Sequence, residues 1–430
     1  MTYDMTASLP GPHDILRKQF ANGVTVLIRA NSDSRSAAIT GNLECPSALD
    51  PIGKGGVADF MASCLTAGTA KRDFNEINET LESAGASLGF SAECRCLSFR
   101  GQCLAEDLTM LLELLLEVLD QPSFPTEHLE NIRSRTLSAY ELHLHDPESM
   151  TDEAFDALLY PNHPFGRPDY DSVESIRGIS REDVIEFHRR WVGPDGMNIA
   201  ISGGVNPAEV MDVCERIFGG WHKPQEHWDE NTVFPEILKP TEPRTRHIEI
   251  PEKSEMSLVI GTLGPKRSDP CWQSAALGNC ILGEFGMMGR IGAVVREENG
   301  LAYYAGSSMN AVTNGGSWSV SAGVNPENVE LAAELIIQEL RRFTTERVTA
   351  EELDDVQSFY IGALPLSLES NAGVARAILN MENHHLGLDY LTRVRERVMS
   401  VTRESILETA RQWLDLENLV RVTAGTAVPK

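Results

Sequence analysis

The sequence lacks the long apolar runs and the leader segment that would direct a chain to a membrane. No run approaches the ~20 apolar residues that a helix needs to span a bilayer. The first residues, MTYDMTASLPGP, have neither a basic region nor an apolar one, as a secretory signal would. These absences predict a cytoplasmic protein with no membrane partner.

Basic charge and paired cysteines are also scarce. The chain carries 37 lysine and arginine residues against 63 aspartate and glutamate residues, a net charge of −26. This charge argues against nucleic acid as a partner and favours a basic peptide. None of the eight cysteines forms a C-x-x-C pair, so buried thiols are expected. Walker, Rossmann and G-x-S-x-G motifs are absent, which excludes the phosphate-loop, dinucleotide and serine hydrolase classes.

What the chain does contain is a repeat of itself at a nearly constant offset. GISREDVIEFHRRW (178 to 191) matches SVTRESILETARQW (400 to 413), so that Trp191 aligns with Trp413, 222 residues later. TEHLENI (126 to 132) matches AEELDDV (350 to 356) at an offset of 224. Offsets this steady over most of the chain predict two homologous domains.

Each half mixes strand patterns with helical ones in the same order, which predicts an α+β fold of two tandem α/β sandwich domains with one antiparallel-rich sheet each. Residues 222–246 are polar, contain proline and show no apolar period, as a linker does. The predicted division is an N-terminal domain over 1–221, a linker over 222–246 and a C-terminal domain over 247–430.

A helix is expected within residues 55–69, GGVADFMASCLTAGT. Its apolar residues recur at the spacing of one helical stripe, which indicates a face packed on a core; they are Val57, Phe60, Met61, Cys64 and Leu65. The other side is small or polar and lets a neighbour or a ligand approach closely; it holds Ala58, Asp59, Ala62 and Ser63.

This stretch resembles the helix G-L-A-H-F-L-E-H-M-x-x-x-G-T of the pitrilysin/insulinase family of zinc peptidases, which includes the mitochondrial processing peptidase. The resemblance implies sandwich domains of the mitochondrial processing peptidase, or metallohydrolase, type. In that family the motif H-x-x-E-H places two zinc-binding histidines and a catalytic glutamate on one helical face. The corresponding positions here are Asp59, Ala62 and Ser63, so all three functional groups are replaced.

The third zinc ligand of the family is a glutamate on a later helix, and Glu141 lies close to that position. One carboxylate with Asp59 and a serine hydroxyl makes a poor zinc site, because zinc prefers imidazole or thiolate donors in a tetrahedral set. A displaced site on His143 and His145 is disfavoured, since residues two apart on a helix face about 200° from each other. We therefore expect no metal in this chain.

A second stretch keeps the family pattern. RIGAVVREENGLAY (290 to 303) is similar to S-R-L-F-x-x-[IV]-R-E-x-x-G-L-A-Y, whose arginine and tyrosine reach the substrate at the zinc. Arg296 and Tyr303 stand at these two positions, and the resemblance implies a catalytic role for both. A surface ion pair with Glu297 is the alternative for Arg296. Core packing beside Leu301 is the alternative for Tyr303.

Glycines precede this pair at every third position, namely Gly283, Gly286, Gly289 and Gly292. The family's partner-type subunits carry a glycine-rich loop here that touches the substrate, so Gly283, Gly286 and Gly289 are candidate substrate-binding residues. Equally, these glycines mark a turn and a tightly packed helix start. Tyr304 is a competing tyrosine, but it does not fit the register of the motif.

The resemblance thus implies the non-metal subunit of a two-subunit zinc peptidase. Its partner would be a homologous chain that keeps H-x-x-E-H and holds the zinc, while this chain would supply Arg296 and Tyr303 for cleavage of a peptide. By itself the chain would be inactive. The alternative is a catalytically inactive scaffold or peptide-binding homodimer of the same fold, in which the pair is residual.

Overall fold

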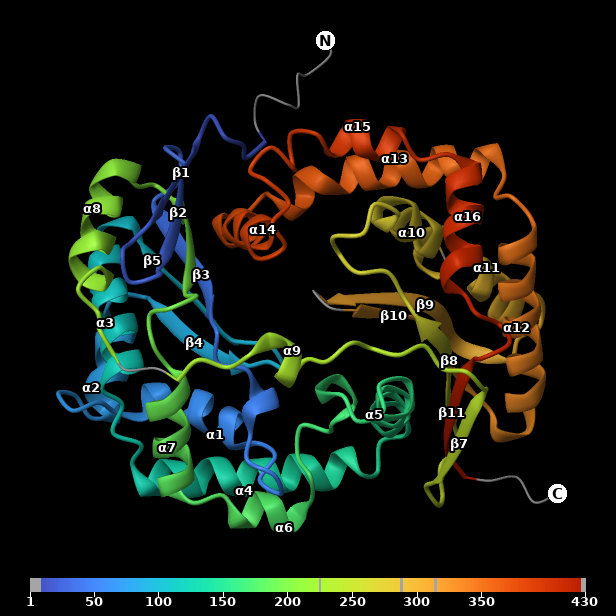
Figure 1. The fold of residues 1–430 in the computed structure, drawn as a ribbon, viewed down its shortest axis with the longest axis horizontal. Coiled ribbons are helices and arrows are strands. Elements are labelled where there is room, and N and C mark those ends of the chain that lie inside the picture. The colour runs from blue at the N-terminus through green and yellow to red at the C-terminus, as the bar shows by residue number, and fades with distance from the viewer. Residues whose placement is uncertain (1–8, 224–225, 287–288, 313–314, 427–430) are drawn as a thin grey trace. The chain divides into compact units, whose positions relative to one another are not determined.

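The computed structural model describes residues 9–223, 226–286, 289–312 and 315–426. The chain forms two compact units, each with its own sheet (Figure 1). The first unit comprises Met1–Ser138, Asp169–Asp229 and Leu364–Arg393, and the second comprises Ala139–Pro168, Glu230–Ala363 and Val394–Lys430. No helix in the described ranges is long and apolar enough to cross a membrane.

The sheet of the first unit has six strands in the order β1-β2-β6-β3-β5-β4. The strands are β1 (Ile15–Gln19), β2 (Thr25–Ala30), β3 (Ser36–Leu43), β4 (Ser87–Ala92), β5 (Leu97–Leu104) and β6 (Asn198–Gly203). The pairing is antiparallel except between β2 and β6. The helices of this unit are α1 (Val57–Cys64), α2 (Phe74–Ser83), α3 (Leu108–Asp120), α6 (Val173–Gly178), α7 (Arg181–Trp191), α8 (Pro207–Phe218) and α14 (Asn371–Asn383).

The sheet of the second unit has five strands in the order β7-β11-β8-β10-β9. They are β7 (Arg244–Glu249), β8 (Met256–Leu263), β9 (Ala302–Val312), β10 (Gly315–Val324) and β11 (Val420–Gly425). The helices are α5 (Pro147–Leu159), α9 (Glu230–Val233), α10 (Trp272–Asn279), α11 (Gly289–Gly292), α12 (Val329–Thr345), α15 (Val394–Met399) and α16 (Arg403–Trp413), with π-helical turns at Cys280–Glu284 and Ala293–Glu298. Two long helices, α4 (Thr126–His143) and α13 (Ala350–Ser367), contribute residues to both units.

The two sheets repeat one topology. Strands β2-β6-β3-β5-β4 of the first match β7-β11-β8-β10-β9 of the second, and β7 and β11 form the one parallel pair of the second sheet, as β2 and β6 do in the first. The predicted α+β fold with two antiparallel-rich sandwich sheets is confirmed.

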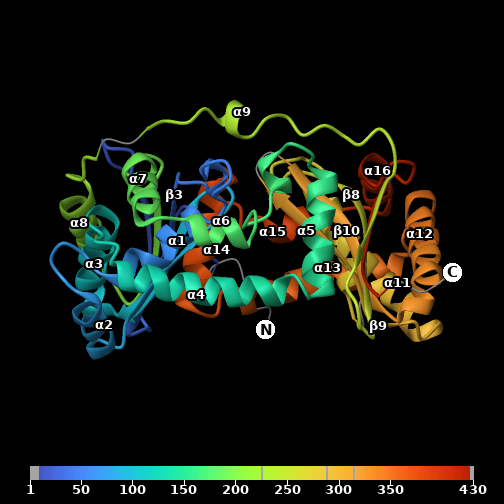
Figure 2. The same cartoon turned by 90° about the horizontal axis from the view of Figure 1, so that it is seen from below.

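Each unit takes one helix from the other half of the sequence. In the first unit α3 and α8 cover one face of the sheet and α14 packs on the other, against β3 and β6 (Figure 1). In the second unit α5 packs on β8 and β11 (Figure 2). Phe155 and Leu159 of α5 are buried there against Val259 and Val422. The predicted division at 221 and 247 follows the sequence repeat, whereas the compact units exchange these two segments.

Candidate functional site

Helix α1 is fixed by its apolar stripe and by a carboxylate at its start. Val57, Phe60 and Met61 are fully buried, as the helical period predicts. Asp50 accepts the backbone N–H groups of Gly56 at 2.7 Å and Ala58 at 2.8 Å, which satisfies donors that a helix start leaves unpaired. Burial raises the pKa of Asp50 to about 7. The helix is therefore a firm frame for the side chains on its other face.

The first of the three replaced positions, Asp59, is occupied by a contact within the protein. The hydroxyl of Tyr170 donates to Oδ2 of Asp59 over 2.5 Å. Burial raises the pKa of Asp59, and the hydrogen bond from Tyr170 opposes that rise. The ring of Tyr170 also lies where a side chain at Gly56 would clash, since a Cβ there would come within 2.4 Å of the ring. Tyr170 thus covers the side of α1 that holds Asp59 and packs against Gly56 at its start.

The other two positions offer no ligand set. Ala62 is 3% exposed and has no donor atom, and the side chain of Ser63 faces solvent. Glu141 is exposed near the end of α4 and belongs to the second compact unit. Across the described ranges, no three His, Cys, Asp or Glu side chains are grouped to hold a metal ion. These residues do not fit zinc, which takes imidazole or thiolate donors in a tetrahedral set.

His143 and His145 do not build a displaced site. Nε2 of His143 lies 2.9 Å from Oε2 of Glu153, and His145 is exposed. The described residues therefore give His143 a carboxylate partner of its own.

Arg296 and Tyr303 lie in one short stretch of the second unit. Arg296 belongs to the π-helical turns Ala293–Glu298, whose residue Val295 is inserted in the core. Gly300 follows with a φ of +62°, which a residue without Cβ adopts at no cost. The chain then enters β9, the edge strand of the sheet.

Tyr303 is the extra residue of a β-bulge in β9. Ala302 pairs with Val324 and Tyr304 pairs with Gly323, so Tyr303 has no partner in the register. Bulges at sheet edges redirect a side chain away from the regular alternation. Tyr303 is 83% exposed, which contradicts the alternative of core packing.

Neither member of the pair is engaged by the rest of the described chain. Arg296 is half-buried, and its guanidinium makes no ion pair or hydrogen bond with another described residue, Glu297 included. The hydroxyl of Tyr303 likewise has no described partner. Tyr304, in contrast, is half-buried, and burial raises its pKa to about 12. Within the described ranges, the side-chain donors of Arg296 and Tyr303 are therefore without a partner.

The glycines ahead of the pair have different surroundings. A Cβ on Gly283 would lie 2.0 Å from the backbone nitrogen of Ser307, and one on Gly289 would lie 2.6 Å from the carbonyl oxygen of Ile281. Close backbone packing therefore explains these two glycines. Gly286 is exposed, with open space around it and a φ of +62°. Of the three candidates, Gly286 is the one whose surroundings leave room for a ligand.

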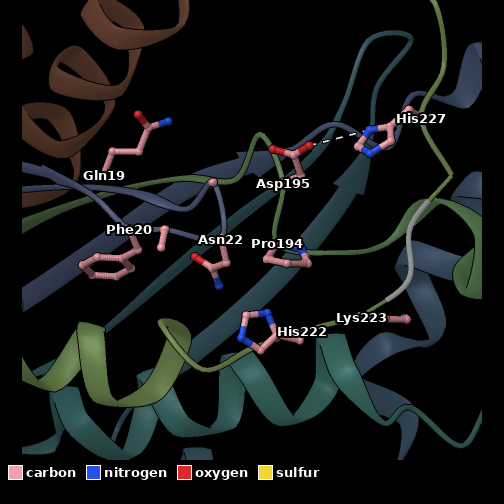
Figure 3. Close-up of a pocket in the computed structure, with 10 residues that line it drawn as sticks. Gln19, Phe20, Asn22, Pro194, Asp195, His222, Lys223 and His227 are labelled. Carbon is pink, nitrogen blue, oxygen red and sulfur yellow. Dashed lines mark ion pairs between the residues drawn. The ribbon is translucent and has the colours of Figure 1, made fainter.

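The first unit also has a surface hollow of about 810 Å³, next to the turn between β1 and β2 (Figure 3). Its polar lining includes Asn22, Asp195 and His227, and Nδ1 of His227 lies 3.6 Å from Oδ2 of Asp195. No residue of α1 lines it. Asn22 donates to the carbonyl oxygens of Phe218 and Trp221, so its amide is already used. The hollow does not bring together groups for catalysis.

Sequence reasoning missed one residue beside each of the two motifs, Tyr170 next to Asp59 in the first unit and Arg290 ahead of Arg296 in the second. Tyr170 is 111 residues from Asp59, and nothing local marks it as a partner. Arg290 forms ion pairs with Glu339 and Glu352 of later helices. The one available signal for Arg290 was its place at the start of the stretch that matches the family.

The fold and these two stretches together define a chain of metallopeptidase architecture with an altered zinc helix. Comparison with known families agrees. Residues 25–170 match the model described as insulinase (peptidase family M16), and residues 178–360 match the one described as peptidase M16 inactive domain. The chain belongs to peptidase family M16, which confirms the resemblance seen in the sequence.

Individual proteins and solved structures are similar to this chain over most of its length. An uncharacterized zinc protease of Mycobacterium leprae is 23% identical over 372 residues, which span 84% of this chain and 80% of that protein. One from Bacillus subtilis is 22% identical over 365 residues, 83% of this chain and 85% of that protein. The crystal structure of a peptidase M16 inactive domain from Pseudomonas fluorescens superposes with a TM-score of 0.89 at 24% identity, covering 97% and 99% of the two chains. A protease from Helicobacter pylori gives a TM-score of 0.88 at 17% identity, covering 97% and 100%. These structures share the fold.

Proposed function

We propose that this chain is the non-metal subunit of a two-chain zinc peptidase. The observation that carries the proposal is the contrast between its two motifs. The positions on α1 hold Asp59 bonded to Tyr170, a buried Ala62 and a solvent-facing Ser63. Tyr303, in contrast, is exposed and Arg296 is half-buried, and the side-chain donors of both have no partner among the described residues. A homologous partner chain with an intact H-x-x-E-H motif would hold the zinc and the general base.

Arg296 and Tyr303 would supply hydrogen-bond donors to a peptide bound at the partner's zinc. The Tyr303 hydroxyl donates a hydrogen bond to the oxyanion that forms on the scissile carbonyl, and the Arg296 guanidinium holds a neighbouring backbone carbonyl of the peptide. The bulge explains why the side chain of Tyr303 leaves the regular pattern. At a regular strand position the side chain would project from one of the two faces of the sheet. The guanidinium is a donor only and the phenol hydroxyl can donate, which suits anionic and carbonyl oxygens.

The net charge of −26 supports a peptide substrate with basic residues, by long-range attraction. We place the pair in the cytoplasm, with peptide as substrate and with neither nucleic acid nor membrane as a partner. This chain would carry no cofactor of its own.

The test is reconstitution with a homologous H-x-x-E-H chain from the same host, assayed on a quenched fluorescent peptide. Arg296→Ala and Tyr303→Phe should each lower kcat roughly 100- to 1000-fold, the usual cost of one oxyanion donor. Tyr304→Phe is the matched control, because Tyr304 is half-buried and pairs with Gly323 in the regular register of the sheet. Unchanged turnover in both variants would leave the inactive scaffold or peptide-binding homodimer as the function.

A further inference from the structure

Arg290, the first arginine of the 290–303 stretch, takes no part in the proposed chemistry, yet its side chain is only 11% exposed. A guanidinium in such a place is stable only when its charge and its donors are matched, because charge burial without a partner is costly. The groups that match it come from two other helices of the same unit.

Arg290 forms a two-pronged ion pair with Glu352, in which Nε and Nη2 each lie 2.7 Å from a carboxylate oxygen. Its Nη1 lies 3.4 Å from Oε1 of Glu339, a residue of α12 that is 5% exposed at its side chain. The guanidinium also lies 5.7 Å from the centre of the Phe343 ring. Glu352 is fixed in turn by the backbone N–H of Thr349 at the start of α13. One arginine therefore ties α11 to both α12 and α13.

The segment that follows Arg290 needs such an anchor. Helix α11 is four residues long, begins and ends on glycine, and continues into π-helical turns over Ala293–Glu298. Helical segments this short are marginal unless tertiary contacts hold them, and π-helical turns are rare. Ile291 and Val295 give the segment its buried apolar contacts. Arg290 adds a directional contact, because its two-pronged ion pair with Glu352 fixes the relative orientation of the two side chains as well as their distance.

We propose that Arg290 is a positioning residue, which fixes the segment carrying Arg296 and Tyr303 through its ion pairs with Glu352 and Glu339. The inference rests on the proposed function, in which those two side chains reach the substrate. Removal of Arg290 shifts them without removing either, and a misplacement of about 1 Å costs roughly 100-fold in rate. The loss falls on kcat more than on KM, since the affected contacts strengthen in the transition state.

The first test uses the chain alone and does not depend on activity. The N–H groups of Gly300 and Leu301 donate to the carbonyls of Arg296 and Val295, so their hydrogen exchange reports on the segment. In Arg290→Gln these amides should exchange roughly 10-fold faster or more, while amides of β8 and β10 keep their rates. Arg342→Gln is the matched control. Arg342 also contacts Glu339, but its side chain is 53% exposed. Unchanged exchange in the Arg290→Gln chain overturns the proposal.

The second test is a double-mutant cycle in the reconstituted pair. Arg290→Gln should lower kcat/KM roughly 10- to 100-fold when Arg296 is present, and less than about 2-fold in the Arg296→Ala background. An equal loss in both backgrounds shows a general structural role and overturns the positioning role. If Arg296→Ala itself leaves turnover unchanged, the proposed function fails, and the exchange measurement still decides whether Arg290 fixes the segment.

Discussion

The hydroxyl of Tyr170 donates to Asp59 over 2.5 Å, across 111 residues of sequence. The resemblance to the family motif aligns Asp59 with the first zinc-binding histidine of that motif, and an internal hydrogen bond engages the side chain at this position. Asp59 is half-buried, and burial raises its pKa. The altered helix has thus become part of the packing of its unit.

Tyr170→Phe should therefore destabilise the protein. The substitution keeps the ring against Gly56 but leaves the Asp59 carboxylate without its donor, which costs about 1–3 kcal/mol. Urea unfolding followed by circular dichroism measures this loss. Tyr303→Phe, at an exposed tyrosine with no described partner, should change stability by less than about 0.5 kcal/mol. Equal stability of the two variants would contradict the role given to Tyr170.

A glutamate at position 62, which the resemblance aligns with the catalytic glutamate of the family motif, should destabilise the protein. Ala62 is 3% exposed, so Ala62→Glu places a carboxylate in a packed site without a partner, at a cost of several kcal/mol. Ser63→Glu, one residue later on the exposed side of the same helix, should cost less than about 0.5 kcal/mol. The melting temperatures of the Ala62→Glu and Ser63→Glu proteins measure the two costs. An Ala62→Glu protein as stable as the parent chain would show that position 62 is open to water.

His188 should make the first unit sensitive to acid. Burial and the nearby Lys223 lower the pKa of His188 to about 4, and its Nε2 lies 2.8 Å from the carbonyl oxygen of Leu119. The unfolded chain binds this proton near pH 6.5, so the stabilisation is complete above about pH 6.5 and is lost as the pH falls toward 4.

The corresponding variant is His188→Gln, which keeps a donor for Leu119 but does not titrate. Between about pH 7 and pH 4.5, the free energy of unfolding should fall by about 2–3 kcal/mol less in the variant than in the parent chain. Urea midpoints at the two pH values measure this difference. Parallel pH dependence in the two proteins would show that His188 takes up its proton without cost in the folded state.

Local patterns were sufficient to predict the frame of the molecule. The apolar period of α1 predicts its buried stripe, because Val57, Phe60 and Met61 point to the same face of the helix, but Ala58 and Ala62 on the other side are buried as well. The repeat predicts two sheets of one topology, since Trp191 and Trp413 occupy matching places. The 290–303 stretch was found by its resemblance to the family motif, and the roles of Arg296 and Tyr303 stay predictions.

The contacts that complete both sites are long-range, and the sequence has no local sign of them. Tyr170 reaches Asp59 from the segment after α5, and Glu352 reaches Arg290 from the start of α13. The exchange of α5 and α14 is also hidden, because short connections favour packing within the same half. In the sequence, the long helices α4 and α13 come directly before α5 and α14, respectively.

The central claim is that Arg296 and Tyr303 serve a metal centre held by a second chain. The most direct measurement is purification of the tagged chain from its native host, with mass spectrometry of what co-purifies and a zinc determination on the complex. The account predicts a homologous chain with H-x-x-E-H in equal amount and about one zinc per pair, as a single three-ligand site requires. Recovery of this chain alone, as a dimer of itself without zinc, would contradict it.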